Sequence, residues 1–168
     1  MIDAHVVITP WSSCAIGGEL FANGATLGGA TSVTWPVAST ALFYPFSVAT
    51  PFTATKIMWA NGAAVSGNVD AGVYDSTGVR VGAIGSTAQA GVSATQSATL
   101  SLVLNVGTYY LALVLDNTTG TFMRRGPGIG VTGWAQIAAA FPLPATVTLA
   151  TGGTAYQPAF GLTSRSFV

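Results

Sequence analysis

The chain has 168 residues, of which 50% are hydrophobic and 6% charged, and its five basic residues balance five acidic ones. This length suits one domain with a single core, and the abundance of apolar residues excludes a disordered chain. Because phosphate binding needs several clustered Lys or Arg side chains, the sparse and balanced charge argues against a nucleic-acid-binding protein.

The first 39 residues contain the stretch GGELFANGATLGGATS and show little alternation of apolar and polar residues. Glycine at this density disfavours the interiors of helices and strands. We therefore predict an extended N-terminal arm over residues 1–39, lying on a neighbouring subunit or on its own subunit, and a β-sandwich domain over residues 40–168. The start, MIDAHVVITPWSSC, has an acidic residue at position 3 and no basic cluster, so we do not expect a secretory signal.

From ALFYPFSVA onward, short runs rich in β-branched and aromatic residues alternate with turn formers, which predicts strands. Pro45 lies inside the first run and lacks a backbone donor, so it indicates an edge strand or a bulge. In TATKIMWAN, the alternation places Ile57 and Trp59 on the face opposite Lys56.

The runs NVDAGVYD and VRVGAIGS, joined by DSTG, predict two strands and a tight turn. Asp75 at the first position and Gly78 at the last suit a type I turn in which the Asp75 side chain caps free backbone donors. Asp70 falls in the middle of its strand, opposite the expected core face. We expect it to pair with Lys56 or Arg80 across the sheet.

The runs ATLSLVLN and GTYYLALVLDN are predicted as a pair of strands, and residues 109–115 are apolar on both faces, which is typical of a central strand. Pro142 and Pro144 stop any helix that AQIAAAF could begin, so we expect a loop or a short helix there and two last strands near TVTLA and QPAFGLT. About eight strands without a long amphipathic helix predict an all-β protein, an antiparallel β-sandwich. Jelly roll is the preferred topology, and an immunoglobulin-like sandwich is the alternative.

Few residues can carry chemistry, since the chain has one His, one Cys and five carboxylates. His5 lies in the predicted arm, and Cys14, being alone, excludes an internal disulfide. Asp70 and Asp75 are an odd number of residues apart, so they should point to opposite faces, which argues against a carboxylate pair for glycoside hydrolysis. A calcium site made by these two and Asn68 lacks the usual density of acidic ligands. We therefore predict no catalytic, cofactor-binding or metal residues and no cofactor.

Other candidate binding groups have simpler interpretations. Arg124 and Arg125 are adjacent, which suits a solvated loop or a subunit contact better than a phosphate clamp, and GPGIGVTG lacks the Lys and Ser or Thr of a P-loop. The apolar runs are far shorter than the roughly 20 residues of a membrane helix, so no membrane partner is expected. Tryptophan faces can stack on sugars, but core or interface packing is the expected role of the candidates Trp11, Trp35, Trp59 and Trp134.

The run ALFYPFSVATPFTATKIMWANGAAVSGNVDAGVYDSTGVRVGAIGSTAQAG, followed by GTYYLALVLDNTTGTF and AAFPLPAT, resembles a recurrent class of tailed-bacteriophage proteins. The segments that carry the resemblance are PF at residues 45–46 with Lys56, NG at residues 61–62, VSGN at residues 65–68, GSTAQ at residues 85–89 and YYLAL at residues 109–113. They span residues 41–148. The resemblance implies a β-sandwich module of a virion, as found among tail-fibre-like, decoration and other structural proteins, and it brings no catalytic motif.

Three functional hypotheses follow. The preferred one is a non-enzymatic structural component of a tailed-bacteriophage virion, made in the host cytoplasm and carried on the particle surface as a capsid decoration or tail-fibre protein. Its expected partners are copies of itself, with a trimer expected by analogy, and the major capsid or tail proteins. The alternative is a module that binds a host receptor or surface glycan. The third hypothesis is a cell-wall-degrading enzyme that would use His5, Asp70, Asp75 and Asp116.

Overall fold

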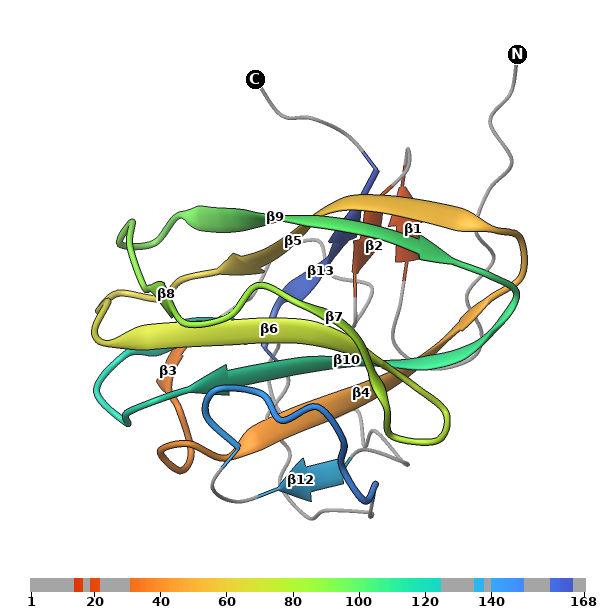
Figure 1. Cartoon of the computed structure of the whole chain (residues 1–168). Coiled ribbons are helices and arrows are strands. Elements are labelled where there is room, and N and C mark those ends of the chain that lie inside the picture. Colours follow the sequence, from red (N-terminus) through yellow and green to blue (C-terminus); the bar gives the residue numbers. More distant parts are fainter. Residues whose placement is uncertain are drawn as a thin grey trace.

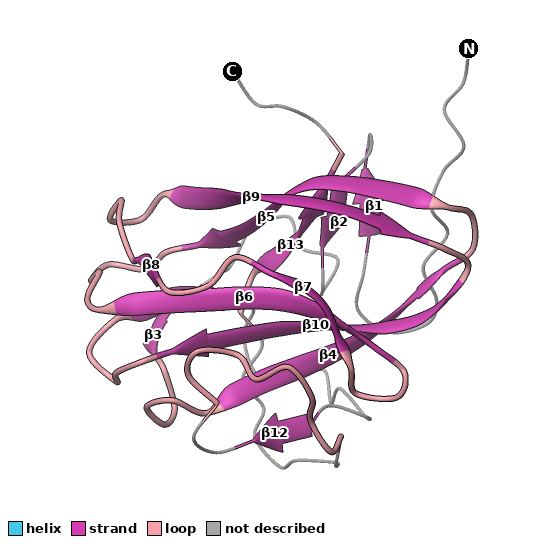
Figure 2. Ribbon diagram, in the orientation of Figure 1, coloured by secondary structure: helices cyan, strands magenta, loops and turns pink. Residues whose placement is uncertain are grey.

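A computed structural model of the chain describes residues 14–16, 19–21, 31–124, 135–137, 140–149 and 158–164. Every regular element in these ranges is a β-strand (Figures 1 and 2). In chain order the strands are β1 (Cys14–Ile16), β2 (Glu19–Phe21), β3 (Thr31–Thr34), β4 (Ala41–Val48), β5 (Phe52–Ala60), β6 (Asn68–Asp75), β7 (Arg80–Ala83), β8 (Thr87–Ala88), β9 (Thr95–Leu104), β10 (Gly107–Leu115), β11 (Thr121–Arg124), β12 (Ala135–Ile137) and β13 (Phe160–Thr163).

The strands form two main antiparallel sheets that face each other across the core. One has the order β1-β2-β13-β5-β9, and the other has the order β12-β4-β10-β6-β7, with β8 also paired to β6. A small sheet of β3 and β11 completes the described structure. The predicted all-β antiparallel sandwich is confirmed, whereas this strand order does not establish a jelly roll, which stays a prediction.

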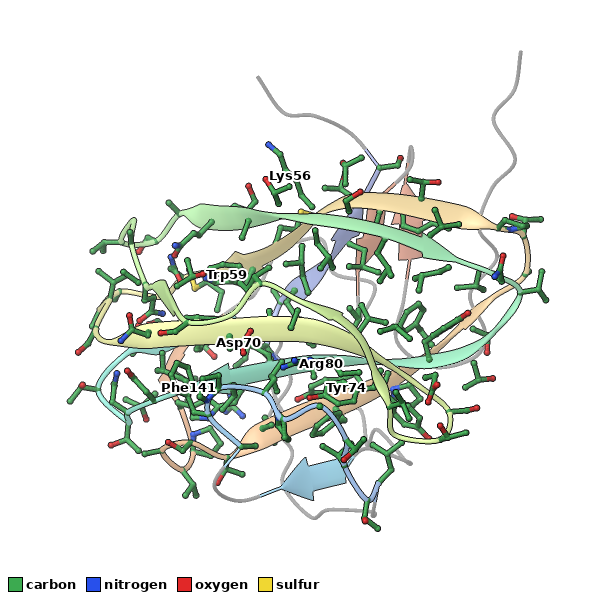
Figure 3. The ribbon with its side chains drawn as sticks, in the orientation of Figure 1. Lys56, Trp59, Asp70, Tyr74, Arg80 and Phe141 are labelled. Atoms are coloured by element: carbon green, nitrogen blue, oxygen red, sulfur yellow. The ribbon has the colours of Figure 1, made fainter. Side chains whose placement is uncertain are left out.

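Alternating side chains fill the space between the sheets, as the sequence predicted. Ile57 and Trp59 of β5 are buried in this main core, and Lys56 lies on the outer face of its sheet (Figure 3). In the opposite sheet, Val69 and Val73 of β6 point into the same core. The period of two along each strand therefore separates the core face from the outer face, because successive side chains point to opposite sides.

Strand β10 is the central strand that its sequence predicted. It pairs with β4 on one side and β6 on the other, and residues 111–115 are fully buried. Leu111 and Leu113 enter the main core, while Ala112 and Val114 enter a second apolar cluster on the other side of the sheet. The apolar residues on both faces are explained by these two separate clusters.

The predicted pairing of the runs ATLSLVLN and GTYYLALVLDN is wrong. Strand β9 pairs with β5, and β10 lies in the opposite sheet, so residues 105–106 carry the chain from one sheet to the other. Leu100 of β9 and Leu111 of β10 both belong to the main core. The apolar sides of the two strands thus meet by packing across the core rather than by hydrogen bonding side by side.

Three smaller predictions also change. Residues 135–137 of AQIAAAF form strand β12 instead of a loop or helix, because they extend the sheet beside Ala41–Phe43. TVTLA forms no strand over its described residues 146–149, whereas QPAFGLT contains β13 as predicted. Strand β4 lies between β12 and β10 and is not an edge strand along its whole length, but Pro45 lies beyond the residues that pair with β12.

The predicted arm is described only in part. Three short strands, β1, β2 and β3, lie before residue 40, and β2 pairs with β13 of the five-stranded sheet. Trp35 is buried in the main core. The described part of the predicted arm is thus joined to the sandwich through β2 and Trp35. Residues 1–13, 17–18 and 22–30 of the predicted arm lie outside the described ranges, and the division of the chain at residue 40 stays a prediction.

Candidate functional site

Residues 140–149, which we call the strap, cross the outer face of the six-stranded sheet without forming a strand (Figure 1). Backbone hydrogen bonds hold the strap at several points. The Ala140 N–H donates to the Ser39 carbonyl at 2.7 Å, and the Val147 N–H donates to the Gly78 carbonyl at 2.8 Å. The Arg80 N–H donates to the Ala145 carbonyl at 2.9 Å. The strap is therefore fixed on the sheet along most of its length.

Apolar side chains form the second cluster between the sheet and the strap. Leu143 of the strap is only 2% exposed, and Phe141 packs partly buried against the same cluster. Phe43 and Tyr74 from the sheet meet edge to face, with ring centroids 5.1 Å apart. The outer face of this sheet is consequently a second core, smaller than the main one.

Three polar side chains of the sheet bind the backbone of the strap. Asp70 Oδ2 accepts a hydrogen bond from the Leu143 N–H at 2.8 Å, and the Arg80 guanidinium donates to the Leu143 carbonyl. The Tyr74 hydroxyl donates to the Pro144 carbonyl at 2.6 Å. In Figure 3, Asp70, Tyr74 and Arg80 gather on the side of the sheet where Phe141 lies. An acidic and a basic side chain thus hold the two backbone groups of one residue.

Burial dominates the electrostatics of this group. Asp70 is fully buried, and desolvation raises its pKa, while its backbone hydrogen bonds, foremost that from Leu143, and the charge of Arg80 act in the opposite direction. Asp70 Oδ1 is buried without a hydrogen-bond partner in the described structure. Burial likewise raises the pKa of Tyr74 to about 12. Both shifts favour the neutral form of the side chain.

The expected environment of Asp70 is corrected by these contacts. Its side chain does point away from the main core, but the strap covers that face. Lys56 lies in the other sheet, so the predicted cross-sheet pair of Asp70 with Lys56 is wrong. Arg80, on the neighbouring β7, acts on the same strap residue as Asp70.

Asp75 has the turn role that the sequence predicted. Its Oδ1 accepts hydrogen bonds from the Thr77 N–H at 2.8 Å, the Thr77 hydroxyl at 2.6 Å and the Val79 N–H at 3.1 Å. The Gly78 N–H closes the turn on the Asp75 carbonyl at 3.1 Å. The hydrogen bond from the Thr77 hydroxyl, followed by that from the Val79 N–H, lowers the pKa of Asp75.

Asp116 holds the opposite end of β6. Its Oδ1 accepts from the Asn68 N–H at 3.0 Å and from Asn117 Nδ2 at 2.7 Å, and its Oδ2 accepts from Asn68 Nδ2 at 2.9 Å. Burial acts to raise the pKa of Asp116, but these hydrogen bonds outweigh it, and the pKa is lowered overall. Asp116 therefore anchors the loop after β10 to the start of β6.

The residues considered for a carboxylate pair or a calcium site are not brought together. Asn68 and Asp75 begin and end β6, and Asp70 and Asp75 are about 16 Å apart along an extended strand. The part of the chain that the structure describes contains no group of three or more His, Cys, Asp or Glu able to hold a metal ion.

The sequence analysis missed a network of buried side-chain amides. It lies at the end of the sandwich where Asp116 holds the start of β6. Gln89 Nε2 donates to Asn61 Oδ1 at 3.1 Å and to the Thr121 carbonyl at 2.9 Å, and Gln89 Oε1 accepts from the Ser66 N–H at 2.9 Å. Asn61 Nδ2 in turn donates to Gln96 Oε1 at 2.9 Å. The turn-forming dipeptide NG at residues 61–62 marked this loop, but the partners come from three other segments.

The tryptophans with described side chains cannot serve as sugar platforms. Trp35 and Trp59 are each 1% exposed, and Trp35 Nε1 donates to the Thr40 carbonyl at 3.0 Å. Cys14 begins β1, and Arg124 ends β11. The remaining candidates lie outside the described residues: His5, Trp11, Trp134, Arg125 and the glycine-rich residues 126–133.

A shallow hollow of about 480 Å³ runs along β7 and is lined by residues 80–85. Arg80 is the ionisable residue of this lining, and its guanidinium already donates to the strap. The described carboxylates, Asp70, Asp75 and Asp116, each accept at least one backbone N–H. The arrangement of these charged groups thus fixes loops and the strap.

No helix with the length and apolarity of a membrane span occurs in the described ranges. Comparisons of the chain with protein-family models, with curated proteins and with solved structures find no match.

Proposed function

We propose that the chain is a structural, non-enzymatic subunit of a tailed-bacteriophage virion, carried on the particle surface as a capsid decoration or tail-fibre protein. The observation that carries the proposal is the use of the rare charged groups. Asp70, Asp75 and Asp116 all hold backbone N–H groups, and Arg80 holds a backbone carbonyl. In an enzyme, by contrast, titratable side chains converge on a space that a substrate can occupy.

Two further features support the proposal. The all-β sandwich agrees with the fold implied by the resemblance of residues 41–148 to tailed-phage virion modules. The low content of charged residues and the zero net charge suit a chain that works within an assembly, because such a surface gives little repulsion between copies. The other virion proteins and further copies of the chain are its proposed partners.

The alternative, a module that binds host glycans, is less well supported. Stacking on a sugar needs an exposed aromatic face, and Trp35 and Trp59 are buried in the main core. We therefore propose glycan binding only as the second candidate function, after the structural role.

Quantitative mass spectrometry of particles purified from the phage that encodes the chain tests the proposal. We expect a fixed copy number, on the order of hundreds for a decoration protein and of tens or fewer for a tail component. Absence of the chain from purified particles would overturn the virion role.

A hydrolysis assay on host cell wall tests the non-enzymatic part. We expect no release of soluble fragments by the purified chain. The matched control is the triple variant Asp70→Asn, Asp75→Asn and Asp116→Asn. Activity that this variant loses while it keeps the circular dichroism spectrum of the folded chain would assign a catalytic use to these carboxylates and contradict the proposal.

A further inference from the structure

The dipeptide Asn61-Gly62 is buried, and hydrogen bonds hold every polar atom of the Asn61 side chain. Asn61 Oδ1 accepts from Gln89 Nε2 at 3.1 Å. Asn61 Nδ2 donates to Gln96 Oε1 at 2.9 Å and also to the Ala90 carbonyl. Because the side chain both donates and accepts, the amide network depends on an asparagine at this position.

The fold also needs a glycine at position 62. A Cβ added to Gly62 would lie 2.3 Å from Ser32 Oγ and 2.4 Å from Thr121 Oγ1. The Gly62 N–H donates to the Thr121 carbonyl at 2.8 Å, so its backbone cannot move away without losing this bond. The packing therefore keeps an asparagine directly before a glycine.

This pair of residues is chemically labile. Glycine has no Cβ to keep its backbone nitrogen away from the preceding side chain, and asparagine is among the residues that heat degrades. The Gly62 nitrogen attacks Asn61 Cγ, a C–N bond forms, the bond from Cγ to Nδ2 breaks, and ammonia leaves with the proton of the Gly62 N–H. Water then opens the resulting succinimide to aspartate or isoaspartate. The net reaction consumes one water and releases one ammonia.

The folded contacts oppose each requirement of this reaction. The hydrogen bond to Thr121 holds the attacking nitrogen of Gly62, and two acceptors hold the leaving Nδ2 of Asn61. Asn61 also forms an antiparallel bridge with Phe122, so its backbone is extended rather than closed toward the ring of the succinimide. These hydrogen bonds must open before the ring can form.

Residues 90–94, which we call the 90–94 loop, lie against the dipeptide. The Asn61 N–H donates to the Ala94 carbonyl at 2.9 Å, and the Ser93 N–H donates to the Gly62 carbonyl at 2.8 Å. The loop is exposed along its whole length, and Ser93 has a φ of 53°, a left-handed conformation that is costly for serine. Exposed loops with strained residues open locally while the rest of a protein stays folded.

We propose that Asn61-Gly62 is a site of self-catalysed deamidation, which the closed 90–94 loop prevents and an opening of that loop permits. In the product, a carboxylate oxygen replaces Nδ2 and faces two acceptors, the Ala90 carbonyl and Gln96 Oε1. A buried charge in this arrangement is unfavourable, so the loop cannot close as before. The reaction makes a brief opening permanent. It is a property of the isolated chain and stands or fails separately from the proposed virion role.

Peptide mass mapping of the purified full chain, incubated at mildly alkaline pH with and without concentrated urea, tests the site. We expect Asn61 to deamidate in urea and at least about tenfold more slowly in the folded chain. The second Asn-Gly dipeptide of the sequence, at residues 23–24, supplies the reference rate in urea. Equal rates at Asn61 with and without urea, or no reaction at Asn61 in urea, would overturn the proposal.

A pair of variants tests the role of the loop. Gln96 Oε1 accepts from Asn61 Nδ2 and from the Ala90 N–H at 2.8 Å, so Gln96→Ala should raise the rate at Asn61 in the folded chain at least about threefold. The matched control is Thr77→Ala, which removes a hydrogen bond at the far end of β6 and should raise the rate less than about twofold. Equal acceleration by both variants would assign the reaction to unfolding of the whole chain and overturn the role of the loop.

The variant Asn61→Asp tests the consequence of the reaction, because it carries the side chain of the aspartate product. Its midpoint of thermal unfolding should be lower than that of the unmodified chain. Asn105→Asp makes the same change of charge at an exposed residue and should leave the midpoint nearly unchanged. Equal midpoints for the two variants would overturn the inference that deamidation keeps the loop from closing.

Discussion

The outer faces of the two main sheets differ in whether another segment of the chain covers them. On the six-stranded sheet, the strap covers Phe43 and Tyr74 and is held by Asp70 and Arg80. On the five-stranded sheet, β9 presents exposed small hydroxyl residues and no charge. One face is therefore a second core with ionisable groups inside it, and the other is a polar surface without ionisable groups along β9.

This difference shows where a chain with few charges uses them. Small hydroxyl side chains keep the β9 face compatible with water, so no charged residue is needed there. The strap lacks the regular ladder of a strand, and its backbone groups need partners from side chains. Asp70 and Arg80 supply such partners to Leu143. Four sets of variants, at Leu143, Gly78, Asp70 and Tyr74, test how much the contacts between the strap and the sheet contribute to stability.

The largest effect is expected from Leu143→Ala. Leu143 is 2% exposed, so its truncation leaves a cavity under the strap and should lower the free energy of unfolding by about 2–5 kcal/mol. Val103→Ala on the outer face of β9 should change it by less than about 0.5 kcal/mol. Urea denaturation measures both, and equal losses would show that the strap is not a second core.

Gly78→Ala should have the next largest effect. Gly78 has a φ of 84°, and an added Cβ would lie 2.1 Å from the carbonyl oxygen of Val147 in the strap. Gly85→Ala is the matched control, since Gly85 has a φ of 72° but no atom within 4 Å of its Cβ position.

Both substitutions share a left-handed backbone cost of about 1–2 kcal/mol. Only Gly78→Ala should add a clash with the strap, so it should lower the free energy of unfolding further. Equal losses in the two variants, measured by thermal unfolding, would mean that the strap moves aside at no cost.

Substitutions of Asp70 separate its hydrogen bond from its charge. Asp70→Ala leaves the Leu143 N–H without its acceptor and should cost about 1–3 kcal/mol. Asp70→Asn keeps an acceptor oxygen and cannot ionise. At neutral pH we expect it to be at least as stable as the unmodified chain.

The pH dependence has a defined sign. Burial raises the pKa of Asp70 above 3.8, so the stability linked to its protonation is fully present below pH 3.8 and is lost as the pH rises through the folded-state value. The unmodified chain should therefore gain stability relative to Asp70→Asn as the pH falls from neutral toward 3.8. Asp75 and Asp116 have lowered pKa values and lose their contribution as the pH falls, but both are present in the two proteins and cancel. A difference independent of pH would contradict the raised pKa.

Tyr74→Phe should give the smallest change. It removes the hydroxyl that donates to the Pro144 carbonyl and should cost about 1 kcal/mol. Burial raises the pKa of Tyr74 to about 12, so its contribution is present below pH 10.0 and is lost as the pH rises toward 12. In an ultraviolet titration of tyrosinate, the variant should lack a late-titrating group, and an unchanged titration would contradict the assignment.

The sequence predicted the faces of strands better than their neighbours. The alternation around Ile57 and Val69 identified the core side of β5 and β6, because burial imposes a period of two. The same pattern cannot say which strand lies alongside, and so β9 and β10 were paired although they lie in opposite sheets. Lateral order depends on contacts between distant segments, which no local pattern records.

The strap was beyond prediction for the same reason. Its sequence around Leu143 has prolines on both sides and no period, and it lies 73 residues after Asp70, the side chain that binds it. The role of Asp75 could be predicted, since its partners Thr77 and Val79 lie within four residues. Local hydrogen bonding could thus be predicted from residue types, whereas the burial of Asp70 could be recognised only in the folded structure.

The repeated crossing of the chain between the two sheets has a consequence for the order of folding. Val48 of β4 pairs with Gly107, and Ile57 of β5 pairs with Leu162 near the end of the described chain. During synthesis the apolar strands β4 and β5 therefore emerge long before their partners. Pairing between such distant segments slows folding. The apolar side chains of β4 and β5 therefore lack these partners until β10 and β13 have been made, and apolar surface left exposed in this way favours aggregation over folding.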